Sequence, residues 1–457
     1  MSRIPARTFL RQAFVELVRR PGRAPAVLGL GWKAFFQQSS RVISATPVVL
    51  GSERELLSWR NGTRPAISIV VPVFNQIATT LACLRSLAGS IASAGSVELI
   101  VVDDASTDPE SERLRALPGI TYHRNRANQG FVGSCNAGAQ LAKGRYVVFL
   151  NSDTVVTAGW IETLVARLDQ PGVGLVGASL QYPDGRLQEA GGLVFADASG
   201  WNYGRNGHPE DPRYRTFRDS HYCSGAALAL TRKRFEELGG FDVRYAPGYY
   251  EDTDLAMRVR ASGARVVYEP ESVVVHLEGA SAGTDPASGM KAAQAVNRER
   301  FREKWEATLR QEHPPAGTDV DLAIRQEGRA WIVACTGVEP EESFLETVEL
   351  LVGRGCVMDL FLGAQLPVER IQALRSRGVY AWPPDWHATG RWLLLRNGHA
   401  AHAALVDGSP VSQAWFKNVR RDLPAARPLW FGQSSRSAAD RVTPVSGMDG
   451  ILAALDA

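Results

Sequence analysis

Apolar stretches of strand length alternate with helical stretches between residues 66 and 276. The expected strands are Ile67–Val71, Val97–Val102, Ile120–His123, Tyr146–Leu150, Val173–Val176, Ala227–Leu230, Val266–Tyr268 and Val273–Val275. The expected helices are Ile77–Ala88, Gly133–Ala142, Gly159–Leu168, Lys233–Leu238 and Thr253–Arg260. Strands separated by crossover helices predict an α/β fold with a mostly parallel sheet that is covered on both faces. Ligands of such sheets bind beyond the carboxyl ends of the strands, so the loops at those ends are the places to search for chemistry.

A second, smaller alternation of strands and helices follows a linker that begins at His313. A charged helix is expected at Asn297–Gln311, before the linker. The elements after it are expected at Trp331–Ala334, Phe344–Leu351, Val357–Leu362, Val368–Arg377 and Ala404–Val406. We therefore predict a main domain over residues 63–312, an accessory α/β domain over 313–457 and a separate N-terminal segment over 1–62.

The N-terminal segment is basic and amphipathic. Apolar residues recur at helical spacing from Pro5 to Arg20, and a second apolar stretch at Ala26–Phe36 contains Trp32 and Phe35. Residues 1–60 have an excess of seven basic over acidic residues, in a chain whose net charge is +3. Such helices bind anionic membrane surfaces. Packing as ordinary helices on the domain behind them is an equally good explanation of the same pattern.

Composition narrows the class of protein. With 457 residues, 45% hydrophobic and 22% charged, the chain exceeds one small module and is not globally disordered. Its five cysteines are scattered without a Cys-x-x-Cys pair, which indicates neither a disulfide framework nor a zinc cluster and fits a reducing cytoplasm. The expected location is therefore the cytoplasm or the inner face of the cell membrane. The confinement of the positive charge to one arm argues against a nucleic-acid partner.

Carboxylates follow two of the expected strands directly. Asp103 and Asp104 end one strand, and two adjacent carboxylates cannot both point into an apolar core at low cost. Asp153 follows the buried strand Tyr146–Leu150, which is a natural place to hold Mg²⁺ or Mn²⁺. Taken by themselves, Asp103 and Asp104 are better explained as turn and cap formers, and Asp153 as a helix cap.

Three further motifs follow along the chain. A glycine-containing loop with Asn128 and Gly130 opens a helix that contains Asn136, and such a loop lets backbone N–H groups approach a phosphate. The run Glu251-Asp-Thr-Asp254 places three acids at the start of another helix, where they also complement the helix dipole. A strand then ends at His276.

Taken in order, these segments resemble the family-2 glycosyltransferases of the GT-A fold, which include many bacterial rhamnosyl- and galactosyltransferases of surface polysaccharides. The resemblance covers roughly residues 66–283. The later region resembles half of a GT-B transferase without a clear phosphate loop, which favours a non-catalytic accessory role.

The resemblance implies a donor site and a metal site. It implies that Asp104 holds the base of a nucleotide-sugar donor, in a pocket that Pro72 and Asn75 line. The other residues that it adds to the substrate site are Asn128, Gly130, Asn136, Ser224 and Gly225. It assigns Asp153 and His276 to a Mg²⁺ or Mn²⁺ ion on the donor diphosphate. The family's metal triplet usually begins with Asp, and Asn151 stands there in this chain, which lowers the negative charge of the site.

The implied reaction is an inverting sugar transfer. Asp252, with Glu251 beside it, is the expected general base, which takes a proton from an attacking acceptor hydroxyl. We therefore expect a metal-dependent hexosyltransferase that uses a dTDP- or UDP-sugar and a polysaccharide or lipid-linked acceptor. Two alternatives are a nucleotidylyltransferase, which needs a basic Gly-rich loop that Pro72-Val-Phe-Asn-Gln76 does not supply, and a catalytically inactive scaffold, which Asn151 makes conceivable.

Overall fold

The computed structural model describes residues 6–19, 24–39, 41–48, 51–91, 97–277, 289–328, 330–338, 340–407, 409–419, 422–431, 443–445 and 447–456. The chain forms two compact units. Unit 1 comprises Ser44–Pro209 and Arg218–Ala316, and unit 2 comprises Ser2–Ile43, Glu210–Phe217 and Gly317–Ala457. In this division the chain up to Ile43 and a short insertion, Glu210–Phe217, group with the C-terminal region.

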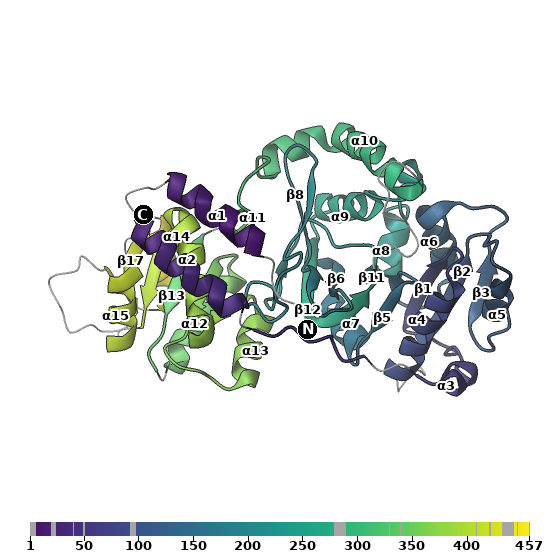
Figure 1. The fold of residues 1–457 in the computed structure, drawn as a ribbon, viewed down its shortest axis with the longest axis horizontal. Coiled ribbons are helices and arrows are strands. Elements are labelled where there is room, and N and C mark those ends of the chain that lie inside the picture. Colours follow the sequence, from purple (N-terminus) through teal and green to yellow (C-terminus); the bar gives the residue numbers. More distant parts are fainter. Residues whose placement is uncertain are drawn as a thin grey trace. The chain divides into compact units, whose positions relative to one another are not determined.

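Unit 1 is built on one large mixed sheet (Figure 1). Its strands, in spatial order, are β10 (Arg218–Asp219), β12 (Arg265–His276), β6 (Val173–Gln181), β11 (Ala227–Thr231), β4 (Tyr146–Leu150), β1 (Ile67–Val73), β2 (Val97–Asp103) and β3 (Thr121–Arg124). At its margins β5 (Thr154–Val156) pairs with β12 and β7 (Leu187–Glu189) pairs with β6, while β8 (Gly192–Val194) and β9 (Gly200–Asn202) form a separate hairpin. The fold class predicted from the sequence is confirmed.

Both faces of this sheet are covered, as the continuous apolar strands predict. All seven residues of β2 are buried, although successive side chains of a strand point to opposite faces. The helices of unit 1 are α3 (Glu53–Ser58), α4 (Ile77–Ser90), α5 (Glu112–Arg115), α6 (Gly130–Leu141), α7 (Trp160–Leu168), α8 (Arg232–Glu237), α9 (Glu251–Ala261) and α10 (Gly289–Glu312). The main core lies where α6 packs on β1 and β2 and where α9 packs on β6 and β12.

Two details of the sheet differ from the expectation. The β3-β2-β1-β4 half is parallel, but β11 lies antiparallel between β4 and β6, because the chain between β6 and β11 contains short hairpin strands in place of a crossover helix. The two strands expected at Val266–Tyr268 and Val273–Val275 are one strand, β12, with an irregular register between Glu269 and Val273. Pro270 lies in that interval and has no N–H to donate to a neighbouring strand.

Unit 2 is built on a parallel sheet of its own (Figure 1). Its strands, in spatial order, are β15 (Val379–Trp382), β14 (Val357–Phe361), β13 (Trp331–Cys335), β16 (Ala403–Val406), β17 (Arg427–Phe431) and β18 (Thr443–Val445). Its helices are α1 (Ala6–Arg19), α2 (Ala24–Ser39), α11 (Val320–Gln326), α12 (Glu342–Gly353), α13 (Val368–Ser376), α14 (His387–Asn397), α15 (Pro410–Val419) and α16 (Gly447–Asp456). The predicted smaller α/β domain is confirmed as a fold.

The second sheet has the strand order of a doubly wound nucleotide-binding fold, with the order reversing between β13 and β16. Ligands of such folds bind at this reversal point. The loops at this point approach each other closely: a Cβ on Gly363 would overlap the carbonyl oxygen of Gly337, and one on Gly337 would crowd Ser409. The Asp407 carboxylate accepts from the Gly337 and Ser409 N–H groups. The accessory role expected for the unit stays a prediction.

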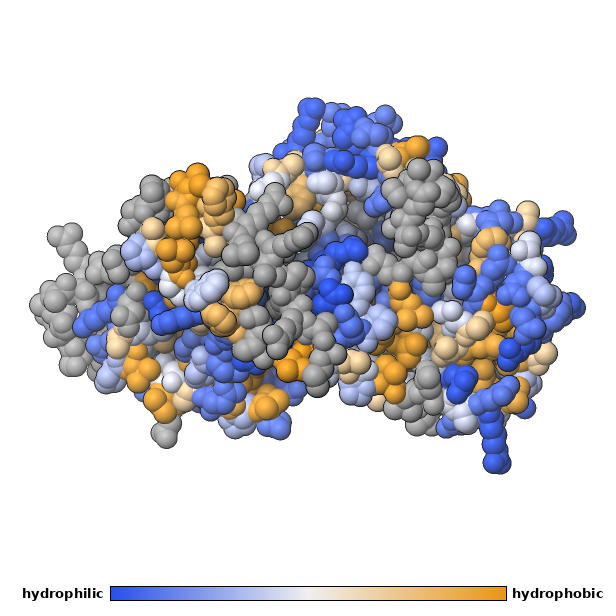
Figure 2. All heavy atoms as spheres, in the orientation of Figure 1, coloured by the Kyte–Doolittle hydropathy of each residue, from blue (hydrophilic) through white to orange (hydrophobic). Residues whose placement is uncertain are grey.

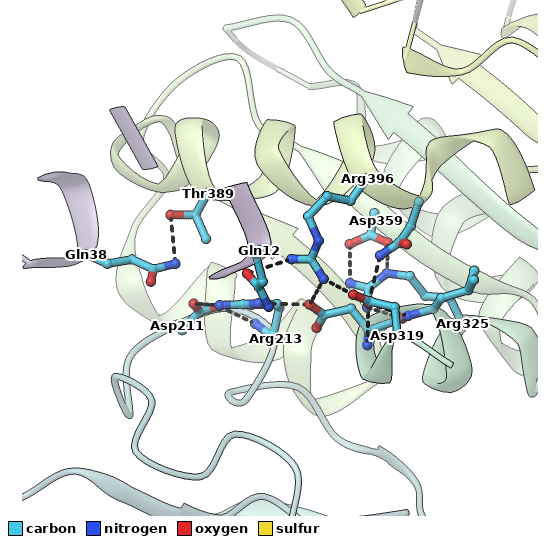
Figure 3. A network of polar contacts seen from close by, with 12 residues as sticks. Gln12, Gln38, Asp211, Arg213, Asp319, Arg325, Asp359, Thr389 and Arg396 are labelled. Carbon is cyan, nitrogen blue, oxygen red and sulfur yellow. Dashed lines mark hydrogen bonds and ion pairs between the residues drawn. The ribbon is translucent and has the colours of Figure 1, made fainter. Parts of the chain in front are cut away.

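Buried ion pairs hold unit 2 together and include the insertion from the main domain (Figure 3). Arg325 makes two hydrogen bonds of 2.7 and 2.9 Å to Asp359, and both side chains are fully buried. Arg213 of the insertion pairs with Asp211 at 2.7 Å and with Asp321 at 3.0 Å. Loss of one partner in such a buried pair leaves an uncompensated charge, so these contacts fix the insertion in the fold of unit 2.

Helices α1 and α2 pack on α14 of the same unit. Val27 and Ala34 of α2 are buried against Trp392 and Leu395. The segment therefore packs on the domain, as one explanation expects. Other apolar side chains of the same helices are exposed, so membrane attachment stays a prediction. Across the described ranges, the helices lack the combination of length and apolar character that a membrane crossing needs.

Candidate active site

The predicted site residues lie in β1, in the loops that follow β1, β2, β3 and β4, in α6 and α9, in the turn before β11 and at the end of β12. Asp103 is fully buried, and its carboxylate accepts from the Ser106 N–H at 2.8 Å, the Tyr122 hydroxyl at 2.6 Å and Arg124. These contacts hold the pKa of Asp103 below its ordinary value, against the effect of burial. Asp103 therefore stabilises the loop in its charged form.

Asp104 organises the entrance of α6. Its two carboxylate oxygens accept from the backbone N–H groups of Gln129 and Gly130, each at 2.8 Å, and from the Asn125 amide at 2.8 Å. The contact to a donor base that was predicted for Asp104 stays a prediction. The Asn75 side chain similarly accepts from the Thr107 and Asp108 N–H groups, which ties the loop after β1 to the loop after β2.

The glycine-containing loop is set by backbone geometry. Gly130 has a φ of +71°, and a Cβ there would overlap the backbone of Pro247. The Asn128 side chain accepts from the Gly130 N–H at 3.1 Å. Asn136 makes two hydrogen bonds to the main chain of Phe241, at 2.8 and 2.9 Å. Pro72, in β1, pairs with Val102 of β2. The substrate contacts expected of these residues remain predictions.

Asn151, Asp153 and His276 come together, although 123 residues separate the last two in the sequence. Nε2 of His276 lies 3.2 Å from Oδ1 of Asp153 and 3.5 Å from Nδ2 of Asn151. β5 makes this possible because it pairs antiparallel with the end of β12, placing Thr154 opposite His276. On its other side, Nδ1 of His276 lies 2.9 Å from Oε1 of Gln188.

The residues fit a divalent cation. Oδ1 of Asn151 and Oδ1 of Asp153 are buried without a hydrogen-bond partner. Nδ1 of His276 donates its hydrogen to Gln188. In the neutral ring this leaves the lone pair on Nε2, the atom that faces Asp153 and that would bind a metal. Neighbouring ligands of an octahedral ion are about 3 Å apart, close to the observed separation. Among the described residues no three His, Cys, Asp or Glu side chains form a metal cluster, so this set depends on the amide oxygen of Asn151.

Asp252 lies at the start of α9 and faces the turn at Ser224–Gly225. Its Oδ2 accepts from the Gly225 N–H at 2.9 Å, and its Oδ1 accepts from the N–H and hydroxyl of Thr253. Burial raises the pKa of Asp252 above its ordinary value, despite these hydrogen bonds. A carboxylate of raised pKa is a better proton acceptor near neutral pH.

The other two acids of this helix differ from Asp252. Glu251 is buried, with Oε2 lacking a partner, and burial together with the nearby Asp252 raises its pKa well above the ordinary value. Asp254 is fully buried and pairs with Arg258 and Lys304, each at 2.7 Å. Asp254 therefore stabilises the packing of α9 and α10, while the role of base expected of Asp252 stays a prediction.

Sequence reasoning missed two polar residues of β7. Gln188 contacts His276, and Oε1 of Glu189 accepts from the Ser224 N–H at 2.9 Å. Both side chains are about as buried as the core, at 2% and 1% exposed. The one signal in the sequence is a polar pair between Leu187 and Ala190-Gly-Gly, in a region for which no strand was predicted.

Glu189 should make the stability of the protein depend on pH. Burial, together with the charge of Asp252, raises the pKa of Glu189 to about 8, although Arg205 and Arg218 act in the opposite direction. The folded protein therefore binds this proton more tightly than the unfolded chain, and stability is lost as pH rises from about 4.5 towards 8. Glu189→Gln removes that loss. We expect the melting temperature of Glu189→Gln, relative to wild type, to increase between pH 5 and 8 in thermal scans; a constant difference would contradict the shifted pKa.

The mixed sheet with polar clusters at its strand ends defines a GT-A-type domain. Residues 68–239 match the family model described as "Glycosyl transferase family 2". This match confirms the resemblance to the family-2 glycosyltransferases that the sequence predicts for this part of the chain.

Similar proteins include bacterial enzymes of glycan synthesis. The O-antigen biosynthesis protein RfbC of Myxococcus xanthus is 31% identical over 241 residues, which are 48% of this chain and 18% of that protein. The N-acetylglucosaminyl-diphospho-decaprenol L-rhamnosyltransferase of Mycobacterium tuberculosis is 27% identical over 249 residues, 48% of this chain and 81% of that protein. This chain spans between 18% and 42% of the length of the first relatives that it matches.

A solved structure with a similar arrangement is that of GalNAc-T7 with UDP, GalNAc and Mn²⁺. It superposes with a TM-score of 0.45 and 19% identity, covering 54% of this chain and 49% of that one.

Proposed function

We propose that this chain is an inverting, metal-dependent glycosyltransferase, which moves a sugar from a dTDP- or UDP-sugar to a polysaccharide or lipid-linked acceptor in cell-surface glycan synthesis. The observation that carries the proposal is the pair of buried oxygens without a hydrogen-bond partner, on Asn151 and Asp153, beside Nε2 of His276 and inside a family-2 domain that also holds Asp252. The relatives support the acceptor class, since one is named for O-antigen biosynthesis and another for a diphospho-decaprenol substrate.

Asp252 supplies the base in this reaction. Its carboxylate takes the proton from the acceptor hydroxyl as that oxygen attacks the anomeric carbon of the donor sugar. The hydrogen bonds from Gly225 and Thr253 hold the carboxylate in one orientation before the acceptor arrives. One base and one displacement invert the anomeric configuration.

Asn151, Asp153 and His276 would hold Mg²⁺ or Mn²⁺. When bound, the ion offsets the negative charge that develops on the departing nucleoside diphosphate. Gln188 keeps the Nδ1 hydrogen of His276 engaged, which leaves Nε2 directed at Asp153. The loops after β1 and β2, tied together by Asn75, hold the nucleotide end of the donor in this proposal.

A panel of nucleotide sugars tests the proposal. Purified protein, an acceptor extract and Mn²⁺ or Mg²⁺ are incubated with each sugar, and free nucleoside diphosphate is measured with and without EDTA. We expect EDTA-sensitive release with a dTDP- or UDP-sugar. Release of pyrophosphate from a sugar phosphate and a nucleoside triphosphate would instead indicate a nucleotidylyltransferase, and silence across the panel would favour a scaffold.

We also assign α1 and α2 to attachment on an anionic membrane surface, where a lipid-linked acceptor lies. Five large apolar side chains of these helices are exposed by half or more: Phe14 67%, Val18 66%, Leu28 56%, Trp32 54% and Phe36 52%. In Figure 2, hydrophobic residues gather over the described parts of α1 and α2. Residues 1–60 add seven net positive charges, each worth about 1 kcal/mol near an anionic surface.

The attachment is tested without deleting the helices, because Val27 and Ala34 are buried against α14. The double variant Trp32→Glu, Phe36→Glu should bind vesicles of phosphatidylcholine and phosphatidylglycerol on the order of tenfold or more weakly, because it removes two large apolar contacts. Val368→Glu, at an equally exposed position on α13 (61%), is the matched control and should bind like wild type. Equal co-sedimentation of the double variant and wild type would show that this surface does not bind membranes.

A further inference from the structure

The short strand β7 contacts both halves of the proposed site through consecutive residues. Gln188 hydrogen bonds to His276, which belongs to the metal-ligand set. Glu189 accepts from the Ser224 N–H, and the next N–H along the chain, that of Gly225, donates to Asp252. One strand of three residues therefore contacts both a proposed metal ligand, His276, and the turn that hydrogen bonds to the proposed base, Asp252.

A β-bulge explains how neighbouring residues both reach the site. Successive side chains of a regular strand point to opposite faces, which would send one of the two away. In the pairing of β7 with β6, Glu189 lies opposite Leu180 and Leu187 lies opposite Gln181, so Gln188 is an extra residue with no partner on β6. A bulge of this kind redirects a side chain and is common beside active sites.

We propose that Gln188 and Glu189 are positioning residues for the glycosyl transfer: Gln188 fixes the His276 ring with Nε2 towards Asp153, and Glu189 fixes the Ser224–Gly225 turn that orients Asp252. The inference rests on the proposed function. Neither residue needs to touch a substrate to act. Gln188 acts through its hydrogen bond to His276, and Glu189 acts through the Ser224–Gly225 turn on Asp252.

The role of Gln188 has a known physical basis. A metal-binding histidine usually donates its second ring N–H to an acceptor, which fixes both its tautomer and its orientation. Removal of such an acceptor typically weakens metal binding by about 10- to 100-fold. The buried position of Gln188, 2% exposed, means that water would not easily replace its oxygen.

Binding of Mn²⁺ alone, measured by calorimetry, tests this half of the inference. Gln188→Leu keeps the size of the side chain but loses the acceptor, and we expect its Kd for Mn²⁺ to rise about 10- to 100-fold. Gln188→Glu keeps an acceptor and should bind Mn²⁺ at least as tightly as wild type. Gln181→Ala, a buried glutamine on the neighbouring strand β6 that contacts Thr46, is the matched control and should not change the Kd.

Two outcomes would overturn this half. If Gln188→Leu binds Mn²⁺ like wild type while His276→Ala loses binding, the metal site stands and the positioning role of Gln188 is wrong. If His276→Ala also binds like wild type, the metal site itself is misplaced and the inference fails with it.

The Glu189 half is tested by rescue. Glu189→Gln still offers an oxygen to the Ser224 N–H, whereas Glu189→Ala does not. We expect Glu189→Ala to lower kcat about tenfold with little change in the donor KM, and Glu189→Gln to recover most of that loss at neutral pH. Equal losses of kcat in the two variants, at equal melting temperature, would contradict a role through this hydrogen bond.

Discussion

Asp252→Asn should lower turnover on the order of a hundredfold or more while leaving donor binding nearly intact, because a general base acts on the proton that moves in the transition state. The amide keeps the size of the side chain, and its oxygen can still accept from Gly225. Steady-state rates and donor calorimetry on the same preparation measure the two effects separately.

Asp219→Asn is the matched control, since Asp219 is an exposed carboxylate on β10 of the same unit that pairs with Arg265. It should keep wild-type turnover. If Asp252→Asn remains active while Glu251→Gln or Asp254→Asn abolishes turnover, the base has been assigned to the wrong acid of this helix.

The second large effect is expected from Asp153→Ala. The ion that Asp153 would hold also binds the diphosphate of the donor in the ground state. This variant should therefore weaken both donor binding and turnover, with partial recovery at high Mn²⁺. The loss should be larger than in an enzyme with two acidic ligands in the triplet, because Asn151 leaves Asp153 as the carboxylate of the set.

The contrast between the two variants is the informative part. Excess Mn²⁺ should not restore Asp252→Asn, because its defect lies in proton transfer. Unchanged donor affinity in Asp153→Ala, with or without added Mn²⁺, would place the metal elsewhere.

The sequence predicted most of the elements that position the site. The bounds expected for β4, Tyr146–Leu150, are those observed, because five consecutive apolar residues leave no other interpretation between two polar segments. The loops after β1, β2 and β4 were identifiable because polar residues follow these buried strands directly. Their convergence at one edge of the sheet follows from parallel pairing.

The pairing of strands that lie far apart in the chain could not be predicted from the sequence. The register of β5 against β12, which brings Asp153 to His276, depends on residues more than 100 positions apart. β7 has three residues, too few to show a period, so Gln188 and Glu189 could not be distinguished from a loop. The partners of α2 were equally hidden, because Trp392 and Leu395 lie in the distant α14.

The arrangement of unit 2 also depends on long-range contacts that the sequence pattern does not show. The alternation of strands and helices predicted the unit, but the strand order that resembles a nucleotide-binding fold, and the backbone packing at Gly337 and Gly363 beside its reversal point, depend on tertiary structure. Local pattern therefore specified the class of fold, and tertiary packing set the strand order and the close contacts between loops.

The anomeric configuration of the product tests the central claim most directly. With the donor that gives the fastest release of nucleoside diphosphate, proton NMR of the product reports the anomeric configuration of the new glycosidic bond. A single displacement assisted by Asp252 predicts a product whose anomeric configuration is opposite to that of the donor, formed only when Mg²⁺ or Mn²⁺ is present. A product that retains the donor configuration, or one that forms equally well in EDTA, would contradict the account.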